Sequence, residues 1–210
     1  MLASASPRRQ ELLQQLGCSF RVLPVDAAEE KQQMDATELV LCNAGRKASA
    51  GAEKSEGLPV LGADTVVWLE GDILGKPRDA EEARFMLERL SGRCHEVLTG
   101  IAFAWQGKLW TAAESTKVFF AEPSSAVIEA YIASGEPLDK AGAYGIQGKA
   151  AAFIKYIEGS YSNVVGLPLY RTVELAKEAG VDLYDNYGAR SSGGRSSTGK
   201  AAAKRGSLSE

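Results

Sequence analysis

Hydrophobic and polar positions along the chain repeat with the periods of both helices and strands, which predicts an α/β fold. The clearest helix follows Asp79, where apolar residues recur at i, i+3, i+4 and i+7. Asp79 and Glu82 resemble a capping box in which Asp replaces Ser or Thr. Near the N-terminus, Ser6 and Pro7 are typical of a helix start, and Gly17 ends the apolar stripe that follows. Both segments are therefore predicted to be helices.

The same two periods predict the other elements of the chain. Further helices are expected over about 35–50, 124–134 and 169–179. Strands are expected over about 1–3, 58–69, 97–105, 109–120 and 153–158, with a turn at 70–72 that leads into a short return strand. Strands and helices that alternate in this way build a sheet covered by helices.

The chain is long enough for one compact domain, and its charge is unevenly distributed. Its 210 residues are 45% hydrophobic, which suffices for a single sizeable core. The net charge is −3, but the Gly- and Ser-rich segment 186–210 has five basic residues and one acidic residue, or +4, which leaves −7 for the body. An acidic body argues against a nucleic-acid groove. We expect a folded domain over 1–185 and a flexible basic tail over 186–210, which either solubilises the protein or weakly tethers a polyanion.

The cysteine and histidine content indicates the cellular compartment of the protein and limits the metal ions that it could bind. The three cysteines, Cys18, Cys42 and Cys94, are odd in number and widely spaced, which favours a reducing compartment, with the cytoplasm as the expectation. His95 is the only histidine, so the chain offers little material for a zinc or copper site. No run approaches the roughly 20 apolar residues that span a bilayer, and the N-terminus lacks a signal-peptide pattern.

Two arginines stand where a helix prefers negative charge. Arg8 and Arg9 follow Pro7 in the first turn of a predicted helix, and the helix dipole disfavours cations there. An anion bound by the free N–H groups, the hydroxyls of Ser4 and Ser6 and both guanidinium groups would offset this charge, and phosphate suits arginine geometry. The alternative is two solvated arginines on an exposed turn.

A carboxylate interrupts the most apolar predicted strand. Burying an unpaired carboxylate costs several kcal/mol, so Asp64 should be paired, bound to a metal, or at a strand end facing a cleft. Lys47 and Lys76 are candidate partners or phosphate ligands. Carboxylates and phosphate oxygens suit a hard cation such as Mg²⁺ or Mn²⁺, for which the acidic pair Glu29 and Glu30 either supplies a second ligand or is simply solvated.

Seven short motifs occur in order between Ser4 and Leu169. They are SASPRR at 4–9, GADT at 62–65, GKP at 75–77, SGRCHEVLTG at 91–100, ESTKV at 114–118, SGEPLDKAGAYGIQG at 134–148 and IEGSYSNVVGLPL at 157–169. Each motif alone is weak, whereas their order and spacing are highly specific. Together they make the chain resemble the Maf family of nucleoside triphosphate pyrophosphatases.

The resemblance implies a fold, a reaction and an assembly. The family fold is a mixed β-sheet flanked by helices, of the ITPase-like kind, with two lobes around a nucleotide-binding cleft, usually in a homodimer. The reaction is hydrolysis of a nucleoside triphosphate between the α and β phosphates, which gives the monophosphate and pyrophosphate and uses a divalent cation such as Mg²⁺, Mn²⁺ or Co²⁺. Phosphoryl transfer of this kind needs positioning and charge neutralisation more than a strong nucleophile.

Position by position, the resemblance also implies roles for individual residues. Asp64 resembles the general base or the carboxylate that organises the metal, with Glu29 or Glu30 on the metal side. The residues that resemble phosphate ligands or line the anion site are Ser4, Ser6, Arg8, Lys47, Lys76 and Lys140. The positions associated with substrate choice are Arg9, Thr65 and Gln147. His95 and Tyr144 match family positions as well, and we expect both to be structural.

The Gly-rich segment 139–148 carries the residue expected to read the base. Its glycines let the backbone bend tightly and approach a ligand. Thymine and uracil present an N3–H donor between two carbonyl acceptors, and the Gln147 amide offers both an acceptor and donors. Gln147 and Thr65 together make the chain resemble the dTTP/UTP branch of the family. The pattern of the branch that acts on 7-methyl-GTP has Glu at the position of Gln147 and Gln at the position of Thr65. The alternative is that Gln147 satisfies backbone groups of its own loop.

The chain departs from the family pattern in two places. The second helix usually carries Arg-Leu-Ala-x-x-Lys-Ala, whereas this chain has Cys42-Asn43-Ala44-Gly45-Arg46-Lys47-Ala48. The acidic segment VDAAEE is shifted, so Asp26, Glu29 and Glu30 are alternatives for the metal-side carboxylate. A pyrophosphatase for dTTP and UTP is the leading hypothesis. The alternatives are a non-catalytic nucleotide-sensing regulator of septum formation or cell division, and a 7-methyl-GTP pyrophosphatase.

Overall fold

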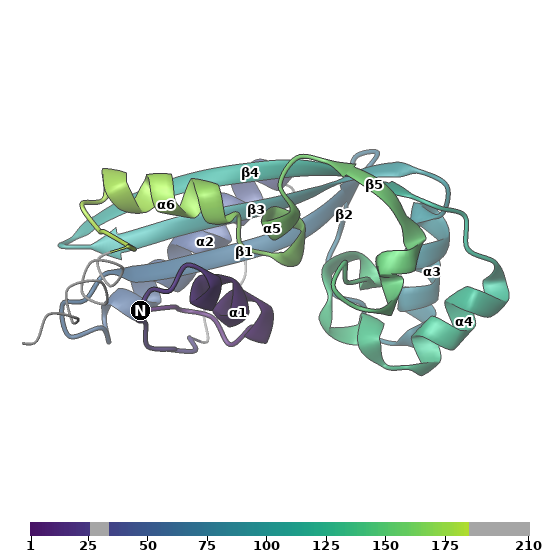
Figure 1. Ribbon diagram of the computed structural model, residues 1–210, viewed down its shortest axis with the longest axis horizontal. Coiled ribbons are helices and arrows are strands. Elements are labelled where there is room, and N and C mark those ends of the chain that lie inside the picture. Colours follow the sequence, from purple (N-terminus) through teal and green to yellow (C-terminus); the bar gives the residue numbers. More distant parts are fainter. Residues whose placement is uncertain (26–33, 185–210) are drawn as a thin grey trace, which may run out of the picture.

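The computed structural model describes residues 1–25 and 34–184 (Figure 1). Its elements in chain order are α1 (Pro7–Gln15), α2 (Ala36–Ala52), β1 (Val60–Leu69), β2 (Asp72–Leu74), α3 (Ala80–Leu90), β3 (Cys94–Trp105), β4 (Lys108–Phe120), α4 (Ser125–Ala133), the 3₁₀ turns η1 (Glu136–Asp139), η2 (Ala141–Ala143) and η3 (Lys149–Phe153), β5 (Ile154–Glu158), α5 (Tyr161–Val165) and α6 (Leu169–Glu178). The predicted α/β set is therefore confirmed. The short helix α5 and the three 3₁₀ turns were not predicted, because segments this short carry no hydrophobic period.

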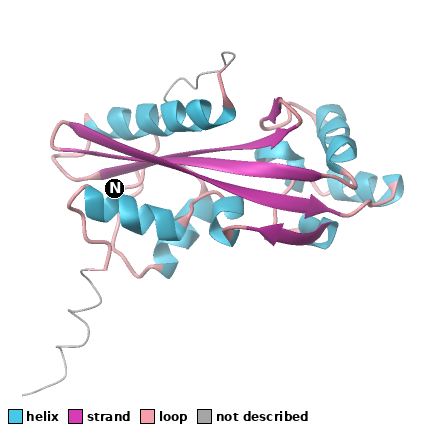
Figure 2. Cartoon of the chain, turned by 90° about the horizontal axis from the view of Figure 1, so that it is seen from above, coloured by secondary structure: helices cyan, strands magenta, loops and turns pink. Residues whose placement is uncertain are grey.

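One five-stranded sheet forms the centre of the molecule, in the order β2-β1-β3-β4-β5. Every pair of neighbouring strands is antiparallel. Among the described residues, parallel pairing occurs only at Leu2, which bridges to Leu61 of β1 and to Val22. This short bridge lies where the first strand was predicted, whereas the five-stranded sheet itself is antiparallel rather than mixed. Figure 2 shows the sheet nearly edge-on and twisted, with helices on both of its faces.

Two separate hydrophobic clusters on the same face of the sheet create the two lobes (Figure 1). In one lobe, α1 and α6 pack on the sheet through Leu12, Leu13 and Leu175. In the other, α3, α4 and the 3₁₀ turns surround a second cluster that contains Leu87 and Phe120. The long strands β1, β3 and β4 run through both lobes, so the sheet itself connects them. The cleft between the clusters therefore has the sheet as its floor.

Helix α2 covers the opposite face of the sheet, and two glycines let it approach closely. A Cβ atom on Gly62 of β1 would lie 2.4 Å from the carbonyl oxygen of Ala44, and one on Gly100 of β3 would lie 2.3 Å from that of Val40. Such distances exclude any side chain, because the obstructing atoms belong to the helix backbone. The close contact lets short side chains of α2 reach the strand beneath.

The helix ends broadly follow the predicted signals. The Asp79 carboxylate accepts a hydrogen bond from the Glu82 amide at 2.8 Å, as in a capping box. The return bond differs, because the Glu82 carboxylate accepts from the Arg78 amide at 2.7 Å rather than from Asp79. Ser6 occupies the N-cap position of α1, but its side chain makes no capping bond. The hydroxyl of Ser6 instead faces the cleft described below.

Some predictions fall on residues outside the described part of the chain. These are the metal-side alternatives Asp26, Glu29 and Glu30 and the basic tail over 186–210. The boundary between body and tail therefore stays a prediction. Within the described residues, the helices are too short or too polar to cross a membrane.

Candidate functional site

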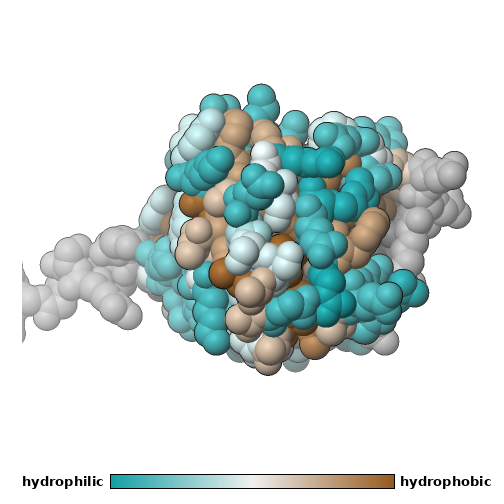
Figure 3. Space-filling view, turned by 90° about the vertical axis from the view of Figure 1, so that its right-hand side faces the viewer, coloured by the Kyte–Doolittle hydropathy of each residue, from teal (hydrophilic) through white to brown (hydrophobic). Residues whose placement is uncertain are grey.

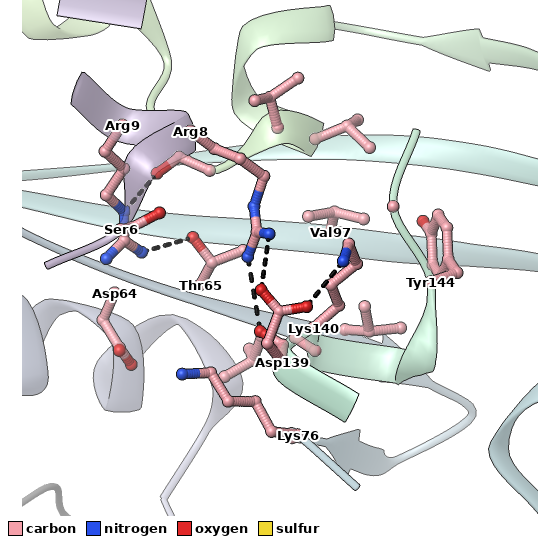
Figure 4. Close-up of a pocket in the computed structure, with 18 of the residues that line it drawn as sticks. Ser6, Arg8, Arg9, Asp64, Thr65, Lys76, Val97, Asp139, Lys140 and Tyr144 are labelled. Atoms are coloured by element: carbon pink, nitrogen blue, oxygen red, sulfur yellow. Dashed lines mark hydrogen bonds and ion pairs between the residues drawn. The ribbon is translucent and has the colours of Figure 1, made fainter. Parts of the chain in front are cut away.

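A cavity of about 580 Å³ opens between the two lobes at one edge of β1. Residues 1–3 bridge to this edge at Leu61, and β2 joins it from Val67 onward, so the stretch between them lacks a strand partner on that side among the described residues. Successive side chains of a strand point to opposite faces. At this gap, Asp64 turns towards α2 and Thr65 towards α1, yet both line the same cavity (Figure 4).

Asp64 is held by two donors from one face of α2. Lys47 Nζ lies 2.7 Å from Oδ1, and Asn43 Nδ2 lies 3.1 Å from Oδ2. The whole residue is only 8% exposed, and the two donors lie one helical turn apart. Asp64 is thus paired, which is one of the three environments expected for it, and it lines the cleft from the middle of β1 rather than from a strand end. Asn43 was not predicted to take part, although a polar residue in the buried stripe of a helix, four residues before a lysine, was a usable signal.

Arg9 is fixed by three neighbours and serves as a support for Thr65. Its Nε donates to the Gly166 carbonyl at 2.8 Å, Nη1 to Ser4 Oγ at 3.2 Å and Nη2 to Thr65 Oγ1 at 3.0 Å. Ser4 is buried and lies behind the guanidinium rather than on the cavity surface, whereas Ser6 lines the cavity. These contacts fit the place of Arg9 and Thr65 among the positions associated with substrate choice.

Arg8 and Lys140 share one carboxylate at the mouth of the cleft. Arg8 Nη1 lies 2.9 Å from Asp139 Oδ2, and Lys140 Nζ lies 2.6 Å from Oδ1 (Figure 4). Partial burial alone would raise the pKa of Asp139, but the hydrogen bonds from Lys140 and Arg8 lower it to about 2. The carboxylate is therefore ionised at neutral pH, and it occupies the position between two cations that a phosphate group would favour.

Lys76 and Gln147 both line the cavity with exposed side chains. Neither side chain has a hydrogen bond or ion pair with another residue in the ranges 1–25 and 34–184. The Gln147 amide thus makes no hydrogen bond to backbone groups of its own loop, contrary to the alternative considered for it. Both groups are placed to contact a ligand.

His95 and Tyr144 form a buried pair beside the cavity. His95 Nε2 lies 2.7 Å from the Tyr144 hydroxyl, and both rings pack edge-to-face against Phe120. Burial lowers the pKa of His95 to about 4. Burial also raises the pKa of Tyr144, with Tyr131 adding to the shift. A neutral histidine and a neutral tyrosine support the start of the loop that carries Gln147, which fits the structural role expected of them.

Positive charge dominates the lining of the cavity among the described residues. Five basic side chains face two carboxylates. The basic residues are Arg8, Arg9, Lys47, Lys76 and Lys140, and the acidic ones are Asp64 and Asp139. The described residues contain no cluster of three His, Cys, Asp or Glu side chains suited to a metal ion. The arrangement suits a polyanion whose own oxygen atoms can supply ligands to a metal ion.

Comparisons with known proteins agree with this geometry. A family model described as "Maf-like protein" matches residues 1–179. The chain is 51% identical to the dTTP/UTP pyrophosphatase of Symbiobacterium thermophilum over 88% of this chain and 95% of that protein. It is 49% identical to the dTTP/UTP pyrophosphatase of Pelotomaculum thermopropionicum over 87% and 97% of the two chains. For the enzyme of the same name from Escherichia coli O157:H7 the identity is 51% over 83% and 89%. The chain belongs to the Maf family.

Proposed function

We propose that this chain hydrolyses dTTP and UTP between the α and β phosphates, releasing the monophosphate and pyrophosphate and so removing these nucleotides from the pool. The relatives named above carry this activity in their names and align over most of both chains. The observation that carries the proposal is a cleft lined by basic side chains together with Asp64, whose two oxygens are each held by a donor.

The phosphate chain would lie among the basic residues of the cleft. Arg8, Lys76 and Lys140 come from different segments around its mouth, and Lys47 rises from α2 beside Asp64. A triphosphate carries several negative charges, and phosphoryl transfer is accelerated mainly by positioned cations that stabilise charge on the phosphate oxygens. Binding would exchange the contact of Arg8 and Lys140 with Asp139 for contacts with phosphate.

Asp64 would orient the attacking water and take its proton. Asn43 and Lys47 use one lone pair on each carboxylate oxygen, and each oxygen has a second lone pair that can accept from water. Asn43 and Lys47 prevent the carboxylate from rotating, because each holds a different oxygen. Fixed geometry of this kind supports general-base catalysis, which requires the base within hydrogen-bond reach of the proton it removes.

The donor set of the site is compatible with a hard divalent cation. Such a cation commonly binds through one or two carboxylates together with substrate phosphates, and Asp64 is a buried carboxylate that lines the cavity. Asp64 would hold it, with Asp26, Glu29 or Glu30 as the predicted second ligand. When bound, Mg²⁺, Mn²⁺ or Co²⁺ would withdraw charge from the phosphate oxygens.

Gln147 and Thr65 would select the base. Gln147 is exposed and its amide has both donor and acceptor groups, which match the N3–H and a carbonyl of thymine or uracil. Guanine presents two adjacent donors on the same edge, which a carboxylate would bind better. The side chains at these two positions therefore support dTTP and UTP over 7-methyl-GTP.

The proposal is tested by pyrophosphate release from dTTP, UTP, CTP, dATP, GTP and 7-methyl-GTP, each with Mg²⁺ and with Mn²⁺. We expect turnover of dTTP and UTP, and a loss of about 10²- to 10⁴-fold in the Asp64→Asn variant. Turnover of 7-methyl-GTP in place of the pyrimidine substrates would contradict the assigned specificity. Tight nucleotide binding without release of pyrophosphate from any substrate would favour the regulator instead, and a chain truncated before residue 186 would then test the tail.

Two expectations about the whole protein stay predictions, namely a homodimer and a cytoplasmic location. Figure 3 shows the end of the lobe that contains α3 and α4, where hydrophobic and hydrophilic side chains are interspersed. Exposed apolar residues of the molecule include Phe85, Tyr156 and Tyr170. Sedimentation equilibrium at several concentrations would give the mass of the assembly, and a monomer at all concentrations would contradict the first expectation.

A further inference from the structure

A row of hydroxyl groups lies directly behind Thr65 and leads away from the cavity. Thr65 Oγ1 is 2.9 Å from Thr99 Oγ1, and the two residues face each other across the β1·β3 pairing. Thr99 Oγ1 lies 3.2 Å from the carbonyl oxygen of Asn163 in α5. Thr99 is fully buried, whereas Thr65 lines the cavity. The row thus begins at the ligand site and ends in the core.

The groups at the two ends of this row determine the direction of its protons. Arg9 Nη2 donates to Thr65 at 3.0 Å, and a guanidinium group has only donors. At the other end, the Asn163 carbonyl can only accept. Each threonine hydroxyl has one proton. The bond between the two threonines and the bond from Thr99 to the carbonyl form together when Thr65 donates to Thr99 and Thr99 donates to the carbonyl. In the reverse order Thr99 would donate to Thr65, and the Asn163 carbonyl would keep only its bond from the Gly166 amide at 2.9 Å, so the row would have one buried hydrogen bond fewer.

This proton order changes what Thr65 offers to a ligand. Its only proton is committed to Thr99, and one of its two lone pairs accepts from Arg9. The lone pair that is left can only accept. We infer that Thr99 is a positioning residue that fixes Thr65 as a hydrogen-bond acceptor, so that the site selects a base with an N–H group facing Thr65. The inference rests on the proposed function and deepens it.

The consequence separates uracil from cytosine. Uracil and thymine carry a proton on N3, which the Thr65 oxygen and the carbonyl oxygen of the Gln147 amide would share, whereas N3 of cytosine is an acceptor, which an acceptor-only hydroxyl would oppose. Removing the Thr99 hydroxyl would release the Thr65 proton, and Thr65 would then donate or accept as the base requires. The preference for UTP over CTP would fall, although Thr99 touches neither nucleotide.

The experiment compares kcat/KM for UTP and CTP in the wild type, Thr99→Val and Thr99→Ser. Valine has the shape of threonine without its hydroxyl, and serine keeps the hydroxyl. We expect the UTP-to-CTP ratio to fall by about 3- to 10-fold in Thr99→Val and to stay within about 2-fold in Thr99→Ser. An unchanged ratio in Thr99→Val, or an equal fall in both variants, would overturn the inference. Thermal unfolding of each variant checks that the fold is kept.

A measurement on the wild type covers the case in which Thr99→Val does not fold. UTP methylated at N3 has lost its N–H, whereas UTP methylated at C5 keeps it. We expect kcat/KM for the N3-methylated nucleotide to be at least about 10-fold lower than for the C5-methylated one. Equal values would overturn the inference. Equilibrium binding of UTP and CTP to the same proteins needs no turnover, so the inference can fail or stand separately from the proposed activity.

Discussion

Arg8 and Asp139 join the two lobes through an ion pair, with 2.9 Å between the guanidinium Nη1 and the carboxylate Oδ2. The arginine belongs to α1 and the aspartate to η1 of the other lobe (Figure 1). The Asp139 side chain is 61% exposed, so the pair contributes little to stability. The pair matters because Asp139 would compete with the substrate phosphates for Arg8 and Lys140, which are both expected to bind phosphate.

Asp139→Asn should therefore strengthen nucleotide binding. Without the carboxylate, Arg8 and Lys140 have one negatively charged competitor fewer, and we expect KM for UTP to fall by about 2- to 5-fold at low ionic strength. Asp72→Asn is a matched control, because Asp72 is 62% exposed and pairs with Arg89 away from the cleft. A rise in KM for Asp139→Asn would mean that the carboxylate aligns the cations for the substrate.

Lys47→Met should cost both stability and activity, and a second substitution can separate the two. The variant leaves Asp64 as a largely buried carboxylate without its cation, which we expect to lower the free energy of unfolding by about 2 to 4 kcal/mol. Adding Asp64→Asn removes the charge and should restore most of that stability, while activity stays at least about 10²-fold down. Urea unfolding and pyrophosphate release on the four proteins measure both. Strictly additive losses of stability would show that the two residues are not coupled.

His95 should make stability depend on pH between its two pKa values. The pKa in the folded chain is about 4 because of burial, against an ordinary value of 6.5. Below 6.5 the unfolded chain binds the proton first, so the free energy of unfolding should fall by about 3 kcal/mol between pH 7 and pH 4 on account of this residue. His95→Gln keeps a polar partner for Tyr144 and should lack this component. Parallel pH profiles for the two proteins would contradict the assignment.

Gly100→Ala should push α2 away from the sheet. The new Cβ would lie 2.3 Å from the Val40 carbonyl, and we expect a loss of about 1 to 3 kcal/mol in unfolding free energy. Because Asn43 and Lys47 move with the helix, kcat should fall as well. Gly75→Ala is the control for stability, since no other group lies within 4 Å of its added Cβ. Wild-type stability and kcat in Gly100→Ala would show that the helix tolerates the displacement.

The sequence predicted the elements of the fold well because their signals are local. The cap at Asp79 placed the start of α3 correctly, because the helix begins at Ala80, and the apolar period that follows matches its buried face. The pairing of Asp64 with a lysine was also foreseen, since a carboxylate inside an apolar strand demands compensation. Local patterns were enough wherever a residue and its partner share one element or one strong physical requirement.

Contacts between distant parts of the chain escaped prediction. Arg8 and Asp139 are 131 positions apart, and nothing near either residue indicates that they pair across the cleft. Thr99 lies in a strand where threonine is unexceptional, and its role follows only from the register that sets it opposite Thr65. Phosphate binding by Arg8 was expected from its place in the helix, whereas its competing carboxylate required the fold.

The strands that floor the cleft have a mechanical consequence. β1 supplies Leu61 to one hydrophobic cluster and Leu69 to the other, and it stays paired with β3 from Val60 to Trp68. A hinge between the lobes would have to bend or break this ladder, so we expect little rotation of one lobe relative to the other. The molecule should instead admit and release nucleotides by exchanging the ion pairs of Asp139 at the mouth of the cleft. The sheet beneath should keep its shape throughout the reaction cycle, and the two lobes should unfold together.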